Sequence, residues 1–153
     1  MNTSAGAEAS PFNHLLVAVD GSDHGLQAAR VAARLARALS ARLTLLTVYH
    51  PPSPALGEPN YSSALTHALD EARQTVDRAV QAVREAGGPD PETEWLAGAP
   101  ADTIVAHARD GGYDLIVVGT RGRGRLEAAL LGSVSSAVAA HAGRPVVIVG
   151  DAG

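Results

Sequence analysis

Short apolar runs alternate with longer amphipathic segments along most of the chain. Near-continuous apolar runs of this length are typical of strands buried on both faces of a parallel sheet. One run, residues 92–97, is less apolar and more alternating, as expected of an edge strand. The predicted strands are residues 15–19, 43–48, 92–97, 115–118 and 145–149.

Between these runs, apolar residues recur every three or four positions, which is the spacing of an amphipathic helix. The clearest example extends from Leu65 to Val83 and ends before Gly87-Gly88-Pro89. Residues 50–63 hold four prolines, so we expect a loop there. The predicted helices run from the turn at 20–23 to about 39, from 65 to the glycine pair, from 100 to 109, and from about 132 to 142.

This order of elements predicts an α/β fold. Strands that alternate with helices form an open, five-stranded, mostly parallel sheet with helices on both faces and right-handed crossovers. We find no internal repeat and no boundary that would divide residues 14–150, which we expect to form one domain. Residues 1–13 are small and polar, and we expect a flexible tail.

Composition excludes several kinds of chemistry. The 153 residues include no cysteine and no lysine, and all twelve basic residues are arginine. Thiol catalysis, cysteine-ligated metals, Schiff-base chemistry and the lysine-containing Walker phosphate loop are therefore excluded. The net charge of −4 argues against general nucleic-acid binding. No apolar run approaches the ~20 residues of a membrane span, and the N-terminus is unlike a signal peptide, so we expect a cytoplasmic protein.

Polar and glycine residues follow three of the predicted strands. They are Asp20 after the first, Tyr49-His50 after the second, and a glycine-rich loop that opens at Gly119 after the fourth. Ligands of open parallel sheets bind beyond the carboxyl ends of the strands, where the winding direction reverses. We therefore expect the binding site at this edge of the sheet.

The glycine-rich loop has the chemistry of a phosphate site. Its glycines allow several backbone amides to approach an anion, and Gly132-Ser133 then opens a helix whose first amides favour negative charge. Ser133 and Ser135 could add hydroxyl donors, while Asp20 could accept from a ribose hydroxyl or hold a hydrated magnesium ion. For Ser22, Asp23 and His24, we favour a structural role at a helix N-terminus.

Other interpretations of these residues were weighed. The loop could be a simple flexible connection, or its arginines at 121, 123 and 125 could form an RNA-binding patch, although no aromatic residues accompany them. The chain has no lysine for a phosphoreceiver site and no GxSxG elbow for a serine hydrolase, so both classes are excluded. Its six histidines do not have the spacing of metal ligands. We expect Trp95 to be a packing anchor on the third strand.

The spacing Gly119-x2-Gly122-x9-Gly132-Ser133 resembles the nucleotide-binding signature of the universal stress protein family, in its ATP-binding subgroup. The segments LLVAVDGS, LTLLTVYH, DLIVVGTRGRG and LLGSVSSAVAAHAGRPVVIV agree with it, so the resemblance covers about residues 13–150. It implies a Rossmann-like fold of the adenine nucleotide alpha hydrolase-like type. The proline-rich loop after Tyr49 departs from the family, in a region that varies among its members.

The resemblance also implies a ligand site and a partner. It places adenine between the first and second strand ends, against the backbone of Val48, and it places ribose and phosphates across the strand edge. It further implies a homodimer through the last strand, Val146 to Val149. The nucleotide-binding positions that it implies are Ala18, Val19, Asp20, Val48, Gly119, Arg121, Gly122, Gly132, Ser133, Val134 and Ser135.

These observations predict an ATP-binding universal stress protein that acts as a nucleotide-responsive dimeric module in stress response, with Mg²⁺ as a candidate second ligand at Asp20. An alternative is a slow ATPase or phosphotransferase that uses the same pocket, although no base is evident beside the γ-phosphate. A dimeric interaction module without nucleotide is the third interpretation.

Overall fold

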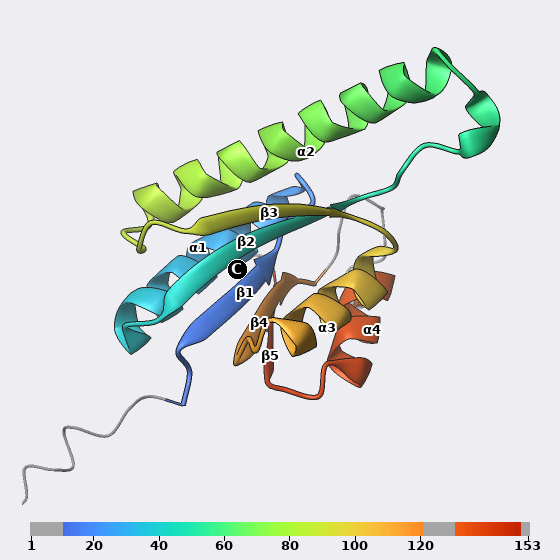
Figure 1. Cartoon of the computed structure of the whole chain (residues 1–153). Coiled ribbons are helices and arrows are strands. Elements are labelled where there is room, and N and C mark those ends of the chain that lie inside the picture. Colours follow the sequence, from blue (N-terminus) through green and yellow to red (C-terminus); the bar gives the residue numbers. More distant parts are fainter. Residues whose placement is uncertain (1–10, 121–130, 151–153) are drawn as a thin grey trace, which may run out of the picture.

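A computed structural model describes residues 11–120 and 131–150 and shows the predicted α/β architecture (Figure 1). Every strand pairing is parallel, and the strands lie in the order β3-β2-β1-β4-β5. The strands are β1 (His14–Ala18), β2 (Arg42–Tyr49), β3 (Glu92–Ala97), β4 (Leu115–Gly119) and β5 (Val146–Val149). The helices are α1 (Asp23–Leu39), the short 3-10 helix η2 (Pro54–Leu56), α2 (Asn60–Glu85), α3 (Pro100–Asp110) and α4 (Ser133–His141). None of these described helices is both long and apolar enough to cross a membrane.

Two helices cover each face of the sheet (Figure 1). Alternate residues of β1 point to opposite faces, so Leu15 and Val17 pack with α1 and α2, while Leu16 packs with α3 and α4. The chain winds outward from β1 through β2 to β3, then crosses to β4 on the other side of β1. The winding therefore reverses between β1 and β4, which places the crevice for a ligand at the carboxyl ends of these strands.

Helix α1 contacts the sheet through small side chains. Its buried residues are one glycine and five alanines, whereas Leu26, Leu35 and Leu39 are only partly buried. Small residues allow the helix axis to approach the sheet and α2 closely. Gly88, which follows α2, extends this contact, because a Cβ there would lie 2.6 Å from the Cβ of Ala33.

Helix α2 begins earlier than the sequence pattern indicated. Residues 50–63 were predicted to be a loop, but Pro54–Leu56 form η2 and α2 begins at Asn60. Proline is tolerated here because the first residues of a helix need no N–H partner. Glu58 also caps the helix, since its carboxylate accepts from the Ser62 amide at 2.9 Å and from the Ser62 hydroxyl. These hydrogen bonds lower the pKa of Glu58.

Strand β3 lies at one edge of the sheet, as predicted, and β5 lies at the other. Trp95 is 37% exposed, and the guanidinium of Arg73 lies over its ring. The distance from Arg73 Cζ to the ring centroid of Trp95 is 5.9 Å. Trp95 lies on the third strand, as expected, and packs against α2 at the surface rather than in the core. Near the start of the described chain, Phe12 packs against the core, and the Asn13 amide donates to the Asp114 carboxylate at 2.8 Å.

The amino ends of the strands hold a buried histidine, although the sequence led us to expect this residue at the surface. His14 lies with its Nε2 2.8 Å from the Thr44 hydroxyl, and an Arg42 nitrogen lies 3.2 Å from its Nδ1. Because arginine can only donate, Nδ1 is the acceptor, which is the arrangement of a neutral imidazole. Burial, followed by the positive charge of Arg42, lowers the pKa of His14.

Candidate functional site

Asp20 lies directly beyond β1, at the carboxyl edge of the sheet. Its Oδ1 accepts hydrogen bonds from the Ser22 amide at 3.0 Å and from the Ser22 hydroxyl at 2.5 Å. Ser22 is also the N-cap of α1, because its hydroxyl accepts from the Gly25 amide at 3.1 Å. The expected capping role of Ser22 is confirmed, and the carboxylate that we expected to meet a ligand is fixed by this cap.

The backbone of Val48 faces the space that β1 leaves empty. The last β1 residue in register is Ala18, opposite Leu46, and the Val19 amide then donates to the Leu46 carbonyl at 2.9 Å. Strand β2 continues to Tyr49, whose carbonyl accepts from the Gly98 amide on the β3 side. Because backbone groups of successive strand residues alternate in direction, the N–H and C=O of Val48 point to the opposite side, beyond the end of β1.

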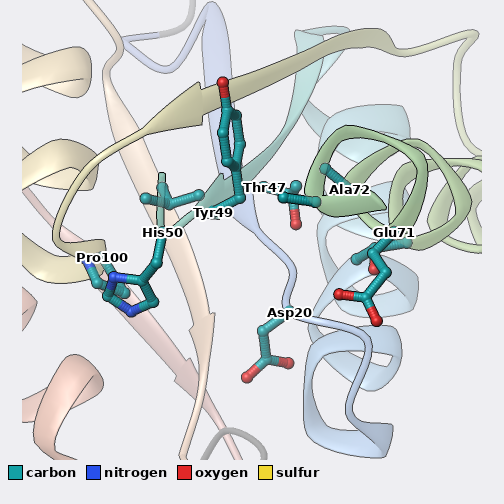
Figure 2. A pocket seen from close by; sticks show the side chains of 10 residues that line it. Asp20, Thr47, Tyr49, His50, Glu71, Ala72 and Pro100 are labelled. Atoms are coloured by element: carbon teal, nitrogen blue, oxygen red, sulfur yellow. The ribbon is translucent and has the colours of Figure 1, made fainter. Parts of the chain in front are cut away.

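A pocket of about 420 Å³ opens beside these groups (Figure 2). Figure 2 shows Glu71 reaching from α2 on one side and His50 and Pro100 on the other, with Asp20 between them. The lining residues are Asp20, Thr47, Val48, Tyr49, His50, Ala68, Glu71, Ala72, Thr75 and Pro100.

The α2 wall of this pocket was not predicted from the sequence. Ala68 lies four positions before Ala72, and Glu71 lies four positions before Thr75, so these residues share one face of the helix. Thr75 is buried, although it is polar. A buried threonine beside a carboxylate on an otherwise apolar helix face is the signal that could have indicated a pocket rather than core packing.

Gly119, at the end of β4, is required for packing against α1. A Cβ at this position would lie 2.8 Å from the His24 carbonyl oxygen and 2.9 Å from its carbonyl carbon. The same first turn of α1 touches Asp20 through Gly25, where a Cβ would lie 3.0 Å from Oδ1. One turn of helix therefore supports both the end of β1 and the end of β4.

The Thr120 carbonyl, just after β4, is joined by hydrogen bonds to the start of α4. That carbonyl accepts from the Gly132 amide at 2.6 Å and from the Ser135 hydroxyl at 2.8 Å. Ser135 is buried, and its hydroxyl also lies 3.1 Å from the Gly132 carbonyl, so this predicted phosphate donor is engaged within the protein. Arg121 and Gly122, two further predicted site residues, lie outside the described residues.

The first amides of α4 have no hydrogen-bond partner within the helix itself. Gly132 is its N-cap with extended backbone and no side-chain cap, and Ser133 is exposed. Such amides, together with the helix dipole, favour an anion. Val134 follows in this turn, half-buried against the core between α3 and the sheet.

The predicted site residues thus divide between the two sides of the crevice. Ala18 packs against the core beneath α3, and Val19 is buried and presents only backbone, so neither offers a polar side chain. Across residues 11–120 and 131–150, no three histidine or carboxylate side chains are grouped to hold a metal ion. A magnesium ion fits Asp20 only if phosphate oxygens and water complete its shell, which is the usual arrangement for nucleotide-bound Mg²⁺.

Known proteins are similar to this chain in sequence and in fold. The family model described as "Universal stress protein family" matches residues 11–150. The chain is 40% identical over 138 residues to "Universal stress protein in QAH/OAS sulfhydrylase 3'region" of Thermus aquaticus, a match that covers 90% of this chain and 98% of that protein.

Two solved structures are similar in fold. Universal stress protein UspA from Lactobacillus plantarum superposes with a TM-score of 0.80 at 30% identity, covering 92% of this chain and 99% of the other. A universal stress protein crystallised in complex with cAMP has a TM-score of 0.65 at 34% identity, with coverage of 92% and 98%.

Proposed function

The chain belongs to the universal stress protein family, and on that basis we propose that it binds an adenine nucleotide at the carboxyl edge of its sheet. A family member of similar fold holds cAMP, which supports an adenine nucleotide as the class of ligand. The finer proposal is that ATP is the preferred nucleotide and that its occupancy regulates the protein in stress response.

The observation that carries the proposal is that the backbone N–H and C=O of Val48 point beyond the end of β1, in a pocket that Asp20 also lines. Adenine has a hydrogen-bond acceptor, N1, beside a donor, the N6 amino group. A backbone N–H and C=O on one residue complement that pair. Asp20 can accept from a ribose hydroxyl, and the pocket volume of about 420 Å³ lies in the range of small-molecule sites.

The phosphates would lie on the β4 side of the crevice. There the amides of Ser133 and Val134 open α4, and Gly122 and Arg121 belong to the proposed phosphate loop. In this arrangement Gly119 and Ser135 shape the loop rather than touch phosphate, because the first packs against His24 and the second bonds Thr120. Asp20 would hold a hydrated magnesium ion through water, and the ion would neutralise part of the phosphate charge.

We also propose a cytoplasmic homodimer formed through β5. This strand lies at the edge of the sheet and its residues Val146 to Val149 are all apolar, so pairing with a second copy would satisfy backbone groups and cover side chains. Sedimentation at micromolar concentration should give twice the monomer mass of 15.6 kDa. A monomer mass at every concentration would remove this part of the proposal.

Titration calorimetry tests the nucleotide proposal. We expect micromolar or tighter binding of ATP, weaker binding of AMP and cAMP, and no measurable binding of GTP, with ATP affinity increased by magnesium. Gly122→Val should abolish binding while the far-ultraviolet circular dichroism spectrum is retained, because a side chain would block the approach of phosphate.

Asp20→Asn supplies the second test. We expect it to weaken ATP binding about tenfold or more, because the oxygen that accepts from the ribose hydroxyl loses its negative charge and the NH2 group replaces the second acceptor oxygen. The matched control is Asp90→Asn, an identical change at an exposed residue beyond α2, which should leave affinity unchanged. Equal affinities for the two variants would place the ligand away from Asp20, and wild-type protein that binds none of the nucleotides would refute the proposed function.

A further inference from the structure

The Ser22 hydroxyl connects the N-terminus of α1 to the carboxylate of Asp20 through two hydrogen bonds. It accepts from the Gly25 amide at 3.1 Å and donates to Asp20 Oδ1 at 2.5 Å, so its donor and its acceptor role are both used. The Ser22 backbone amide adds a second bond to the same oxygen at 3.0 Å. These two bonds fix the position of Oδ1 relative to α1.

The protein around Asp20 is shaped to the carboxylate. Gly25 is buried, and a Cβ there would lie 3.0 Å from Oδ1 and 3.2 Å from the Asp20 amide nitrogen. The residue before Asp20 is held to β2, since the Val19 carbonyl accepts from the Thr47 hydroxyl and its amide donates to the Leu46 carbonyl. Backbone and side chain of Asp20 are thus restrained from opposite sides.

We propose that Ser22 is a positioning residue that sets the selectivity of the pocket for a ribonucleotide over a deoxyribonucleotide. Ser22 does not line the pocket, whereas Asp20 does, so Ser22 acts through the orientation of that carboxylate. The inference rests on the proposed nucleotide function, in which Asp20 accepts from a sugar hydroxyl. A carboxylate that can rotate would meet that hydroxyl only part of the time.

Three substitutions separate positioning from helix capping. Ser22→Thr keeps a hydroxyl and should behave as wild type. Ser22→Gly keeps a favourable N-cap residue and the backbone amide that donates to Asp20, but it removes the hydroxyl donor. Gly25→Ala keeps every hydrogen bond and improves the helix propensity of the position, while its Cβ presses on Oδ1. The matched control is Ser53→Gly, which removes the same group from the N-cap of η2, where the serine accepts from Ala55 at 3.2 Å.

The readout is the ratio of the dissociation constants of deoxy-ATP and ATP, measured by calorimetry with the 2′-deoxy and 3′-deoxy forms in turn. When the missing hydroxyl is the one that donates to Asp20, we expect this ratio to be about ten or more in wild type, Ser22→Thr and Ser53→Gly. The ratio should fall to about two in Ser22→Gly and Gly25→Ala. A purely structural role would lower the affinity for all nucleotides together and leave the ratio unchanged, which would overturn the proposal, as would a ratio of one in wild type.

A ligand-free measurement keeps this inference separate from the nucleotide proposal. Three-bond NMR couplings report the χ1 angle of Asp20, and we expect one rotamer in wild type and Ser22→Thr but averaging in Ser22→Gly. A single, unchanged rotamer in Ser22→Gly would refute the positioning role whatever the protein binds. Ordered couplings in a wild-type protein that binds no nucleotide would instead refute the proposed function while the positioning of Asp20 stands.

Discussion

Replacing Gly119 by alanine should destabilise the protein by crowding α1. The added Cβ would lie 2.8 Å from the His24 carbonyl oxygen, 2.9 Å from its carbonyl carbon and 2.9 Å from its Cβ. Two of these atoms belong to the backbone in the first turn of α1, so no side-chain rotation can relieve the contact. Gly119 pairs with Val149 of β5, so β4 cannot easily retreat either.

The size of the effect follows from the energetics of overpacking. Inserting a methyl group into a well-packed contact costs about 1–3 kcal/mol. Alanine offsets about 0.4–1 kcal/mol of this cost, because it restricts the unfolded chain. We therefore expect a net loss of roughly 1–2 kcal/mol and, for a chain of this size, a fall in Tm of about 2–8 °C.

Gly150 provides the matched control on the neighbouring strand. It follows Val149 directly, and a Cβ there would meet, among the residues that the structure describes, Thr120 Cγ2 at 3.7 Å, which is an ordinary contact. Urea and thermal unfolding should therefore show Gly150→Ala unchanged or slightly more stable than wild type. If Gly119→Ala proved as stable as Gly150→Ala, the first turn of α1 would not be packed as described, and the glycine would need another explanation.

Two further predictions concern parts of the fold remote from the pocket. Because the pKa of His14 is lowered in the folded protein, the unfolded chain binds its proton first as the pH falls below the usual value of 6.5, so stability should decrease from pH 7 toward pH 5; urea unfolding of His14→Gln should show a smaller decrease, and equal decreases would contradict the assignment. Arg144 donates from one guanidinium nitrogen to the carbonyls of Ala108 at 3.0 Å and Tyr113 at 2.7 Å, joining the ends of α3 and α4. Arg144→Met should cost about 1–3 kcal/mol of the free energy of unfolding in urea. The control Arg109→Met changes an exposed residue whose side chain pairs with its neighbour Asp110, and it should cost less than ~0.5 kcal/mol. Similar losses for both variants would refute the role of Arg144.

The fold could be predicted because the apolar periodicity is strong and the order of elements leaves few topologies. The strands Leu15–Val19 and Leu115–Val118 are apolar on both faces, which requires helices on both sides of the sheet. Helix α2 shows where the pattern misled. The run of prolines up to Pro59 indicated a loop to residue 63, but the capping carboxylate of Glu58 lets the helix begin at Asn60.

The site was predicted less completely, because its details depend on tertiary contacts. The backbone of Val48 becomes available to a ligand only because β1 ends before β2 does. The pocket wall at Glu71 and Thr75 forms only because α2 lies across that end. Ser135 illustrates the converse. Its place in the motif suggested a ligand donor, yet its hydroxyl meets the Thr120 carbonyl, a partner that lies fifteen positions away in sequence.

The most direct test of the account is an NMR titration of ¹⁵N-labelled protein with AMP and with ATP. We predict that the amide signals of Val48, Asp20, Ser133 and Val134 shift as nucleotide is added until the site is saturated. ATP should shift the amides of α4 more than AMP does. The amide signals of Arg42 and Glu92, at the amino ends of β2 and β3, should not shift. Shifts confined to these amino ends, or no shifts with either nucleotide, would contradict the assignment of the site.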